Sequence, residues 1–366
     1  MADLKTTFCG FALDNPFILA SGPLSYSAEG IIRATKAGAA AVVTKTIRTT
    51  AAINPKPHMV LSGKNSLINS EQWSDYPPER WIKEEIPRAK DAGVKCLIAS
   101  IIAGNDDPDE FLSLAKPIEE AGADMIEAAN SSYIEVGKLL DMVKPIKKEL
   151  KIPVIVKISN NWKNAAELTE RLAQSGFDAI TVMDGMGPTT RFDLRTGKPL
   201  VGGYGGSGHI TGSTIFPFAL QLVRSIAFNY KNDIMGLGGI TYPSDAMEML
   251  MAGASACGVC SSVIINGVDY FSKLIEGLDK GLEKYGYNSV KEIIGKSLQY
   301  REVDFDYKSE NFKFYPEKCS NCRRCVTVCA YCARTLELGF MHVNPIECRS
   351  CGLCFTACPT NAISML

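Results

Sequence analysis

The chain has 366 residues, 46 % of them hydrophobic and 22 % charged, with a formal net charge of −1. This length accommodates one large domain and one small one, and the near-neutral charge does not favour nucleic acid or an anionic membrane as a partner. Residues 1–10 lack the charged and apolar segments of an export signal, and no apolar run is long enough to cross a bilayer. We therefore expect a cytoplasmic protein.

Short apolar runs alternate with longer helical patterns over the first 300 residues. The predicted strands are Phe17–Ala20, Ala41–Thr44, Cys96–Ser100, Met125–Ala128, Val154–Lys157, Ala179–Val182, Asp233–Gly236 and Ala256–Val259. The predicted helices between them are Glu29–Ala37, Glu79–Asp91, Asp109–Ala121, Val136–Glu149, Ala165–Gln174, Phe218–Ala227 and Pro243–Ala252. This alternation predicts an α/β fold, a (β/α)8 or TIM barrel, with a doubly wound open sheet as the alternative.

Polar residues gather where the predicted strands end, which is where barrels of this kind carry their chemistry. Lys45 and Lys157 each end a strand, and a buried ammonium needs a partner. Gly238–Gly239 and Ser261–Ser262 follow the last two strands, where barrels often bind phosphate. We expect an anionic or electron-rich ligand at this rim, the alternative being two surface or salt-bridged lysines.

The cysteines are concentrated near the C-terminus, where nine of the thirteen lie between Cys319 and Cys358. Their spacing is Cys319-x2-Cys322-x2-Cys325-x3-Cys329, then Cys348-x2-Cys351-x2-Cys354-x3-Cys358 followed by proline. In such repeats three close thiolates hold one [4Fe–4S] cluster, and the fourth cysteine crosses to the other cluster. The first cluster is thus assigned Cys319, Cys322, Cys325 and Cys358, and the second Cys348, Cys351, Cys354 and Cys329.

Two structural zinc sites are the alternative for this tail, although zinc sites typically use pairs of Cys-x2-Cys. The extra Cys332 is expected to be a packed or loop cysteine and not a ligand. The tail resembles bacterial two-cluster ferredoxins. We expect a barrel domain over residues 1–305 and a ferredoxin-like domain over residues 311–366.

Several strand-end motifs resemble a known family. They are Ala20–Pro23, Thr44–Thr46, Val156–Lys157, Gly238–Ile240 and Val259–Ser261. They resemble the FMN barrel of dihydroorotate and dihydropyrimidine dehydrogenases. The order of barrel and ferredoxin domain is most similar to the catalytic subunit of bacterial NAD-dependent dihydropyrimidine dehydrogenase. The resemblance implies an FMN-dependent oxidoreductase of pyrimidine metabolism, acting on CH–CH groups and suited to anaerobic conditions.

The resemblance also implies which residues hold FMN. By matching positions these are Ala20, Ser21, Lys45, Thr46, Asn69, Lys157, Gly212, Ser213, Gly238, Gly239, Cys260 and Ser261. Lys157 is expected to act catalytically near the flavin N1 edge, where a cation stabilises the reduced ring. Cys260 is expected to contribute its backbone and not a reactive thiol.

The substrate side of the family pattern is only partly present. Asn69 and Glu71 match positions that contact the pyrimidine, and Ser132 matches the catalytic acid/base position. Ala129 stands where the family has an asparagine, and a shift of one residue would use Asn130 instead. The substrate identity is therefore open.

Asp184 follows the sixth strand, where the family has an asparagine. A carboxylate only accepts hydrogen bonds, so it would favour a substrate with additional N–H or O–H donors, or serve as a second general acid. The alternative is a pairing with Arg191, Arg195 or Lys198 in the next loop. That loop, residues 185–212, contains His209 and has the length of a lid or binding loop.

Flavin and iron–sulfur clusters in one chain predict an oxidoreductase that acts on a C=C or CH–CH bond of a pyrimidine-like ring. A dihydroorotate dehydrogenase-like enzyme, or a reductase of another cyclic unsaturated compound, is the alternative. An electron-transfer subunit with no substrate of its own is a third reading. No Gly-x-Gly-x-x-Gly unit is in the expected context, so the electron partner would be an NAD(P)H-dependent flavoprotein subunit or a ferredoxin. A homodimer is compatible with this organisation.

Overall fold

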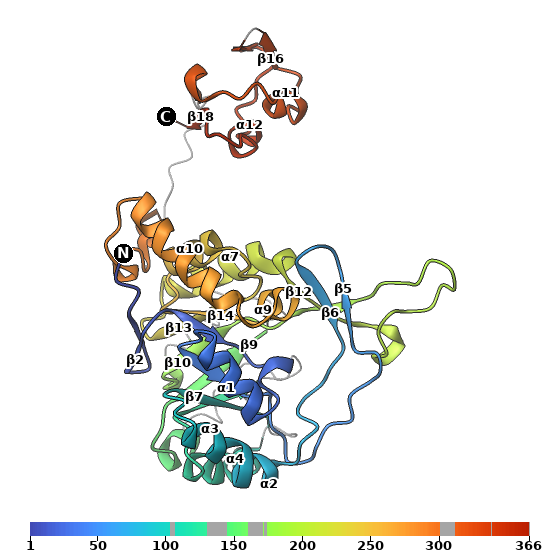
Figure 1. Ribbon diagram of the computed structural model, residues 1–366, viewed down its shortest axis with the longest axis vertical. Helices are drawn as coiled ribbons and strands as arrows, with labels where there is room; N and C mark the ends of the chain where they lie inside the picture. Colours follow the sequence, from blue (N-terminus) through green and yellow to red (C-terminus); the bar gives the residue numbers. More distant parts are fainter. Residues whose placement is uncertain are drawn as a thin grey trace. The chain divides into compact units, whose positions relative to one another are not determined.

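The computed structural model describes residues 1–102, 107–129, 145–159, 171, 174–300, 312–337 and 339–365. The chain divides into two compact units, Met1–Arg301 and Glu302–Leu366. The first unit runs from blue to orange in Figure 1, and the second is red.

Eight parallel strands of the first unit close into a barrel in the order β10-β13-β14-β3-β4-β7-β8-β9. They are β3 (Phe17–Leu19), β4 (Ala41–Val43), β7 (Leu97–Ile101), β8 (Met125–Ala129), β9 (Val154–Ile158), β10 (Ala179–Val182), β13 (Asp233–Leu237) and β14 (Ala256–Val259). Nearly every residue of these strands is buried, because the barrel interior covers one face and helices cover the other. All eight predicted strands and the (β/α)8 barrel are confirmed, and the open sheet is wrong.

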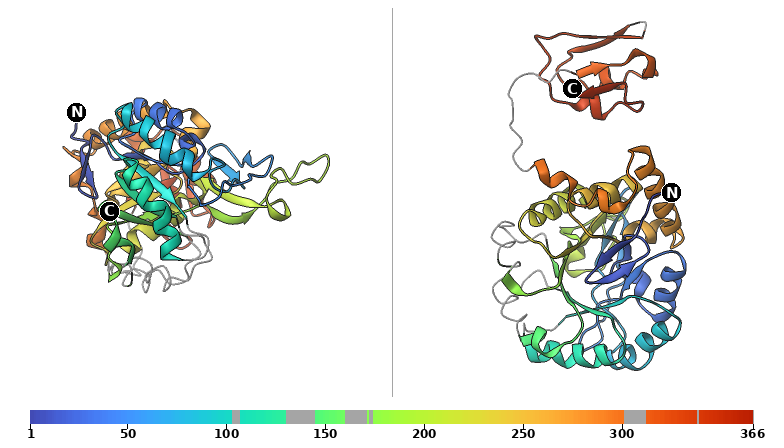
Figure 2. Two further views of the ribbon diagram at one scale, coloured as in Figure 1. Left: turned by 90° about the horizontal axis from the view of Figure 1, so that it is seen from below. Right: turned by 90° about the vertical axis from the view of Figure 1, so that its left-hand side faces the viewer.

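Helices surround the strands, as Figure 2 shows. Those that correspond to predictions are α1 (Ala28–Lys36), α4 (Pro108–Glu120), α7 (Phe216–Ala227) and α8 (Pro243–Met251). The predicted helix Glu79–Asp91 is divided into α2 (Pro78–Arg80), a π-helical turn (Trp81–Glu85) and α3 (Ile86–Asp91). Two further helices, α9 (Ser261–Asn266) and α10 (Tyr270–Lys284), follow the last strand. The predicted helices Val136–Glu149 and Ala165–Gln174 lie largely outside the described residues.

A hairpin of β1 (Thr6–Phe8) and β2 (Phe11–Leu13) lies next to the amino ends of the barrel strands. Phe8 and Leu13 pack there with the first inward-facing residues of the barrel, among them Ile18 and Met235, in a cluster of apolar side chains. Because this end of the barrel is apolar, a polar site belongs to the opposite end, where the strands have their carboxyl ends.

A second sheet is formed by residues that follow barrel strands. Its order is β11-β12-β6-β5, all antiparallel, with β5 (Met59–Leu61), β6 (Ser66–Asn69), β11 (Met186–Thr189) and β12 (Gly208–Gly212). The prediction of a loop over residues 185–212 is therefore wrong at both ends, where β11 and β12 form. Gly208 is required for close pairing, since a Cβ there would lie 2.8 Å from the carbonyl oxygen of Asn69.

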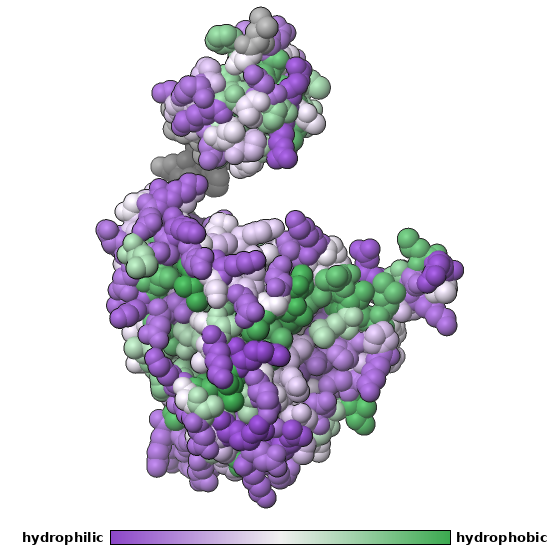
Figure 3. All heavy atoms as spheres, viewed as in Figure 1, coloured by the Kyte–Doolittle hydropathy of each residue, from purple (hydrophilic) through white to green (hydrophobic). Residues whose placement is uncertain are grey.

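The segment between β11 and β12 projects away from the barrel, to the right in the left-hand view of Figure 2. Leu194 is 99 % exposed, and Phe192 is also exposed. Figure 3 shows hydrophobic residues gathered over β5, β6 and β12 on the face in view. No helix within the described ranges is both long and apolar enough to cross a bilayer.

The second unit is built from two similar halves. Its elements are β15 (Phe312–Phe314), α11 (Arg324–Thr327), β16 (Arg334–Glu337), β17 (Phe340–Val343), α12 (Leu353–Thr356) and β18 (Ile363–Met365). Strand β15 pairs with β18, and β16 pairs with β17. Residues with positive φ stand at equal offsets in the two cysteine runs: Asn321 and Ser350, Arg323 and Gly352, Cys332 and Asn361. The sequence repeat is therefore also a backbone repeat.

Candidate functional site

Two lysine ammonium groups lie at the carboxyl ends of barrel strands, and each is ion-paired. Lys45 Nζ lies 2.7 Å from Glu71 Oε2 and 3.0 Å from the carbonyl oxygen of Gln72. Lys157 Nζ lies 2.7 Å from Asp184 Oδ1. The lysine side chains are only 9 % and 11 % exposed. Of the two alternatives for these lysines, salt-bridged lysines are confirmed. Surface lysines are wrong, because both side chains are largely buried.

Asp184 pairs with a barrel lysine and not with a cation of the loop that follows it, which was the alternative. Its carboxylate pairs with Lys157, whereas Arg195 pairs at 3.7 Å with Asp193 in its own loop. Asp184 follows β10 and Lys157 lies on the neighbouring β9, so the barrel register brings them together. The carboxylate therefore faces the rim of the barrel.

Glu127 on β8 is a buried carboxyl group beside this pair. Its Oε2 accepts a hydrogen bond of 2.7 Å from Thr181 Oγ1, and its Oε1 has no partner among the described residues. Burial raises the pKa of Glu127, although Lys157 and the Thr181 bond act in the opposite direction. Glu127 was not predicted as a site residue, although it is the one acidic residue of an otherwise apolar strand.

The charge of Lys157 is held by its surroundings. Burial alone would lower the pKa of this ammonium, but Asp184 and Glu127 outweigh that effect and raise it. The side chain is therefore a fixed cation at neutral pH. Such a cation is suited to an electron-rich ligand edge.

A chain of hydroxyl groups runs across the same rim. Ser21 Oγ and Thr46 Oγ1 lie 3.1 Å apart, and Thr46 Oγ1 lies 3.1 Å from Ser100 Oγ. The Cys260 thiol lies 4.0 Å from the carbonyl oxygen of Ser21. Burial raises the pKa of the Cys260 thiol, while Lys157 and Lys45 oppose the shift. Four separate strand ends thus contribute to one polar surface.

The predicted phosphate loops approach each other closely. Gly239 has φ +84°, and a Cβ there would lie 2.7 Å from the carbonyl oxygen of Gly212. Ser261 Oγ donates a hydrogen bond of 2.8 Å to Thr211 Oγ1, next to Gly212. Ser262 Oγ is buried and has no hydrogen-bond partner in the described part of the chain. A buried hydroxyl without a partner calls for a bound group, which fits the phosphate of a flavin nucleotide.

The remaining predicted residues are placed as follows. Ala20 is buried after β3, and Gly238, with φ +123°, precedes Gly239. Ser213 Oγ lies 3.3 Å from Ser66 Oγ. The predicted Ser132 and Asn130 lie outside the described residues.

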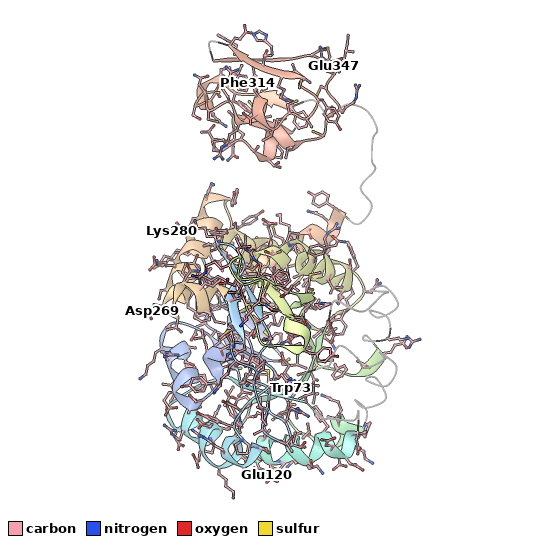
Figure 4. All side chains as sticks on the ribbon, turned by 90° about the vertical axis from the view of Figure 1, so that its right-hand side faces the viewer. Trp73, Glu120, Asp269, Lys280, Phe314 and Glu347 are labelled. Atoms are coloured by element: carbon pink, nitrogen blue, oxygen red, sulfur yellow. The ribbon has the colours of Figure 1, made fainter. Side chains whose placement is uncertain are left out.

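Asn69 is the last residue of β6, directly before the loop that carries the partner of Lys45. Its Oδ1 accepts a hydrogen bond of 2.7 Å from the backbone N–H of Glu71. The same loop holds Trp73, labelled in Figure 4, and the centre of its ring lies 4.3 Å from the guanidinium carbon of Arg48. These contacts fix the direction from which Glu71 reaches the rim.

In the second unit, one hollow joins cysteines from both runs. It is lined by Cys329 of the first run and by Cys348, Cys351 and Cys354 of the second. This is the set that the crossing pattern assigns to one cluster. No three His, Cys, Asp or Glu side chains of the described residues are grouped closely enough to hold a single metal ion.

Backbone N–H groups point at cysteine sulfur atoms in this unit. Ala333 N lies 3.3 Å from Cys329 Sγ, and Ala362 N lies 3.2 Å from Cys358 Sγ. Thiolates bound to iron accept such bonds, so the donor pattern fits an iron–sulfur cluster. Cys332 is exposed and outside the hollow, and none of the thirteen cysteines forms a disulfide.

A TIM barrel with charged and hydroxyl groups at its rim, followed by a unit with a cysteine-lined hollow, fits the class of iron–sulfur flavoproteins. Two family models match the chain: "Dihydroorotate dehydrogenase" over residues 3–282 and "4Fe-4S binding domain" over residues 341–364. The chain belongs to the dihydroorotate dehydrogenase family. It is an FMN-dependent oxidoreductase that acts on CH–CH groups and carries an iron–sulfur domain.

The chain is similar to proteins named as dihydroorotate dehydrogenases and to proteins named as dihydropyrimidine dehydrogenase subunits. It is 33 % identical over 313 residues to dihydroorotate dehydrogenase B (NAD(+)), catalytic subunit, of Pyrococcus furiosus, which covers 80 % of this chain and 98 % of that protein. It is 28 % identical over 359 residues to the NAD-dependent dihydropyrimidine dehydrogenase subunit PreA of Escherichia coli K12, which covers 89 % of this chain and 85 % of that protein.

Proposed function

We propose that this enzyme reduces, or in reverse oxidises, a carbon–carbon bond of a pyrimidine-like ring and passes electrons through two [4Fe–4S] clusters. The observation that carries the proposal is the ion pair between the buried Lys157 and the half-buried Asp184 at the rim of the barrel, in a chain with two four-cysteine runs. A ring bound at this rim meets a fixed cation and a hydrogen-bond acceptor. We assign the barrel to residues 1–305 and the cluster domain to residues 311–366, in the cytoplasm.

FMN, when bound, exchanges two electrons with an organic ring and single electrons with iron–sulfur clusters. The residues that would hold it are Ala20, Ser21, Lys45, Thr46, Asn69, Lys157, Gly212, Ser213, Gly238, Gly239, Cys260 and Ser261. Lys157 contributes a permanent positive charge, because its neighbouring carboxyl groups raise its pKa. That charge stabilises an anionic edge of the cofactor.

Substrate contacts come from a further set of residues. Asn69 and Glu71, with Asn130, orient the ring, and Ser132 moves the proton to or from the ring carbon. Asp184 accepts hydrogen bonds from ring N–H groups, where an amide would also donate. The carboxylate therefore selects rings rich in N–H donors.

Electrons would leave or enter through the eight cysteines of the tail. The first cluster would be held by Cys319, Cys322, Cys325 and Cys358, and the second by Cys348, Cys351, Cys354 and Cys329. The hollow that contains Cys329 beside the second run supports this crossing. The external partner is an NAD(P)H-dependent flavoprotein subunit or a ferredoxin, since the names of the relatives include NAD and describe subunits.

Dihydroorotate oxidation is the second candidate. It is favoured by the relatives of 30–33 % identity named as dihydroorotate dehydrogenase B catalytic subunits, against 28 % for the dihydropyrimidine dehydrogenase subunit. The two candidates share the cofactor residues and differ in the ring that the rim accepts.

Anaerobic titration of the purified protein distinguishes them. Uracil or thymine should reoxidise the flavin of the reduced protein, whereas dihydroorotate should leave the flavin of the oxidised protein unreduced. Flavin reduction by dihydroorotate would replace the first candidate by the second. No response to either class of ring would contradict both and indicate an electron-transfer subunit. Chemical analysis should give eight iron and eight sulfide per chain, as two cubanes require.

A further inference from the structure

A buried arginine lies between the two cysteine runs. Arg334 is the first residue of β16 and only 4 % exposed. Burial alternates along this strand, so Arg334 and Leu336 share the inward face. A guanidinium at such a position has lost most of its hydration and needs an anionic partner.

No carboxylate of the described residues supplies that partner. Arg334 Nη1 lies 3.1 Å from Met341 Sδ, and the guanidinium carbon lies 5.5 Å from the centre of the Phe312 ring. No ion pair involving Arg334 exists in the described part of the unit. A thioether and an aromatic ring do not neutralise a buried cation.

The internal repeat shows that this charge is not needed for the backbone. Arg334 stands five residues after Cys329, and Ile363 stands five residues after Cys358. The residue before each donates its N–H to the sulfur of that cysteine, at 3.3 Å and 3.2 Å. Ile363 is 1 % exposed, so the second half fills the equivalent buried position with an aliphatic side chain.

The surroundings of Arg334 identify what its charge faces. It lines the hollow that contains Cys329, Cys348, Cys351 and Cys354. Cys329 belongs to the first run and the other three cysteines to the second, so the guanidinium lies at the set that the crossing pattern assigns to one cluster.

We propose that Arg334 is the buried counter-charge of the iron–sulfur cluster held by Cys329, Cys348, Cys351 and Cys354, and that it raises the reduction potential of this cluster. This inference rests on the two-cluster assignment proposed above. Each reduction brings one electron from the flavin and no proton, so the net charge at the four thiolates becomes more negative by one. The guanidinium stays protonated throughout and stabilises the reduced state more than the oxidised state.

The test is a redox titration of the complete protein, followed by electron paramagnetic resonance. Arg334→Ile copies the residue that the second half uses. It should make one-electron reduction of the second cluster on the order of tenfold less favourable, a shift of about 59 mV to more negative potential. Arg334→Lys keeps the charge and should remain within about twofold of the unmodified protein, about 18 mV.

Arg349→Ile is the matched control. Arg349 lines the same hollow, but its side chain is exposed and its Nη1 donates to the carbonyl oxygen of Ile346 at 2.6 Å. Solvent screens an exposed charge, so the loss of Arg349 should change the one-electron reduction equilibrium of the cluster by less than twofold. An equal shift for Arg349→Ile and Arg334→Ile would overturn the proposal, as would an unchanged potential in Arg334→Ile with full iron and sulfide content.

If Arg334→Ile fails to incorporate clusters, Arg334→Gln and Arg334→Lys decide. If only Arg334→Lys incorporates clusters, the position requires a positive charge, which supports the proposal. If Arg334→Lys and Arg334→Gln both fail, the position requires the shape of the arginine side chain, and the proposal is refuted. An iron content below eight in the unmodified protein would contradict the two-cluster assignment instead. The potential shift would then still be measured on the remaining cluster, so the two failures are distinguishable.

Discussion

The barrel unit and the cysteine-rich unit are stabilised in different ways. The barrel has a continuous core of buried aliphatic and aromatic side chains between its strands and helices. In the described part of the second unit the buried apolar side chains are few: Ala333, Leu336, Cys354, Ala362 and Ile363. Domains of this size rarely form a sufficient apolar core and depend on metal or disulfides. The comparison indicates that the barrel folds around apolar residues, whereas the second unit folds around its inorganic groups.

The largest expected effect comes from removing a cluster ligand. Cys354→Ser should lose the iron of the second cluster and unfold the cysteine-rich unit, while the barrel remains folded and retains flavin. Iron analysis and limited proteolysis measure the two outcomes. Cys332→Ser is the control, because Cys332 is exposed and outside the hollow, and it should retain all iron. If the second unit stayed folded without iron, the claim that it folds around its inorganic groups would be refuted.

Chemistry on the barrel side should be lost without any loss of fold. Ser132→Ala removes the proposed proton donor and should lower turnover by ~10²–10⁴-fold, with flavin absorbance and iron content unchanged. Steady-state kinetics with the accepted ring compound measure the effect. Unchanged turnover would remove Ser132 from the mechanism.

The rim carboxylate should control selectivity more than rate. Asp184→Asn restores an amide, so the ratio of kcat/KM for uracil to that for a ring with additional N–H or O–H donors should rise by about tenfold. Asp193→Asn is the matched control, since Asp193 pairs at 3.7 Å with an arginine that is 90 % exposed. An unchanged ratio for Asp184→Asn would show that the ring does not contact this position.

The smallest expected effect concerns the pH dependence of barrel stability. The raised pKa of Glu127 means that the folded state favours its protonated form. Its contribution to stability is present below the ordinary carboxyl pKa and is lost as pH rises through the raised value. Glu127→Gln cannot ionise and should flatten the fall in the free energy of unfolding as pH rises above the ordinary carboxyl pKa.

Urea denaturation of the barrel at several pH values measures that slope. The stability of the cysteine-rich unit should be the same in the variant and the unmodified protein, because Glu127 belongs to the barrel. An unchanged slope for the barrel would show that Glu127 does not titrate in this range.

The eight barrel strands and the two cysteine runs could be predicted because their signals are local. A buried parallel strand is a short apolar run, and cluster ligands recur at fixed short spacings. The sheet of β5, β6, β11 and β12 was not predicted. Its strands have only three to five residues each, and β6 pairs with β12 from well over a hundred residues away.

The amino-acid sequence by itself determined the barrel, the cysteine repeat and the positions of both lysines at strand ends. Only the tertiary structure decided the partners: Glu71 for Lys45, Asp184 for Lys157, and cysteines of both runs around Arg334. The physical reason is that periodicity reports which face of an element is buried. The electrostatic environment of a charge depends on which distant residues the fold brings within a few ångströms.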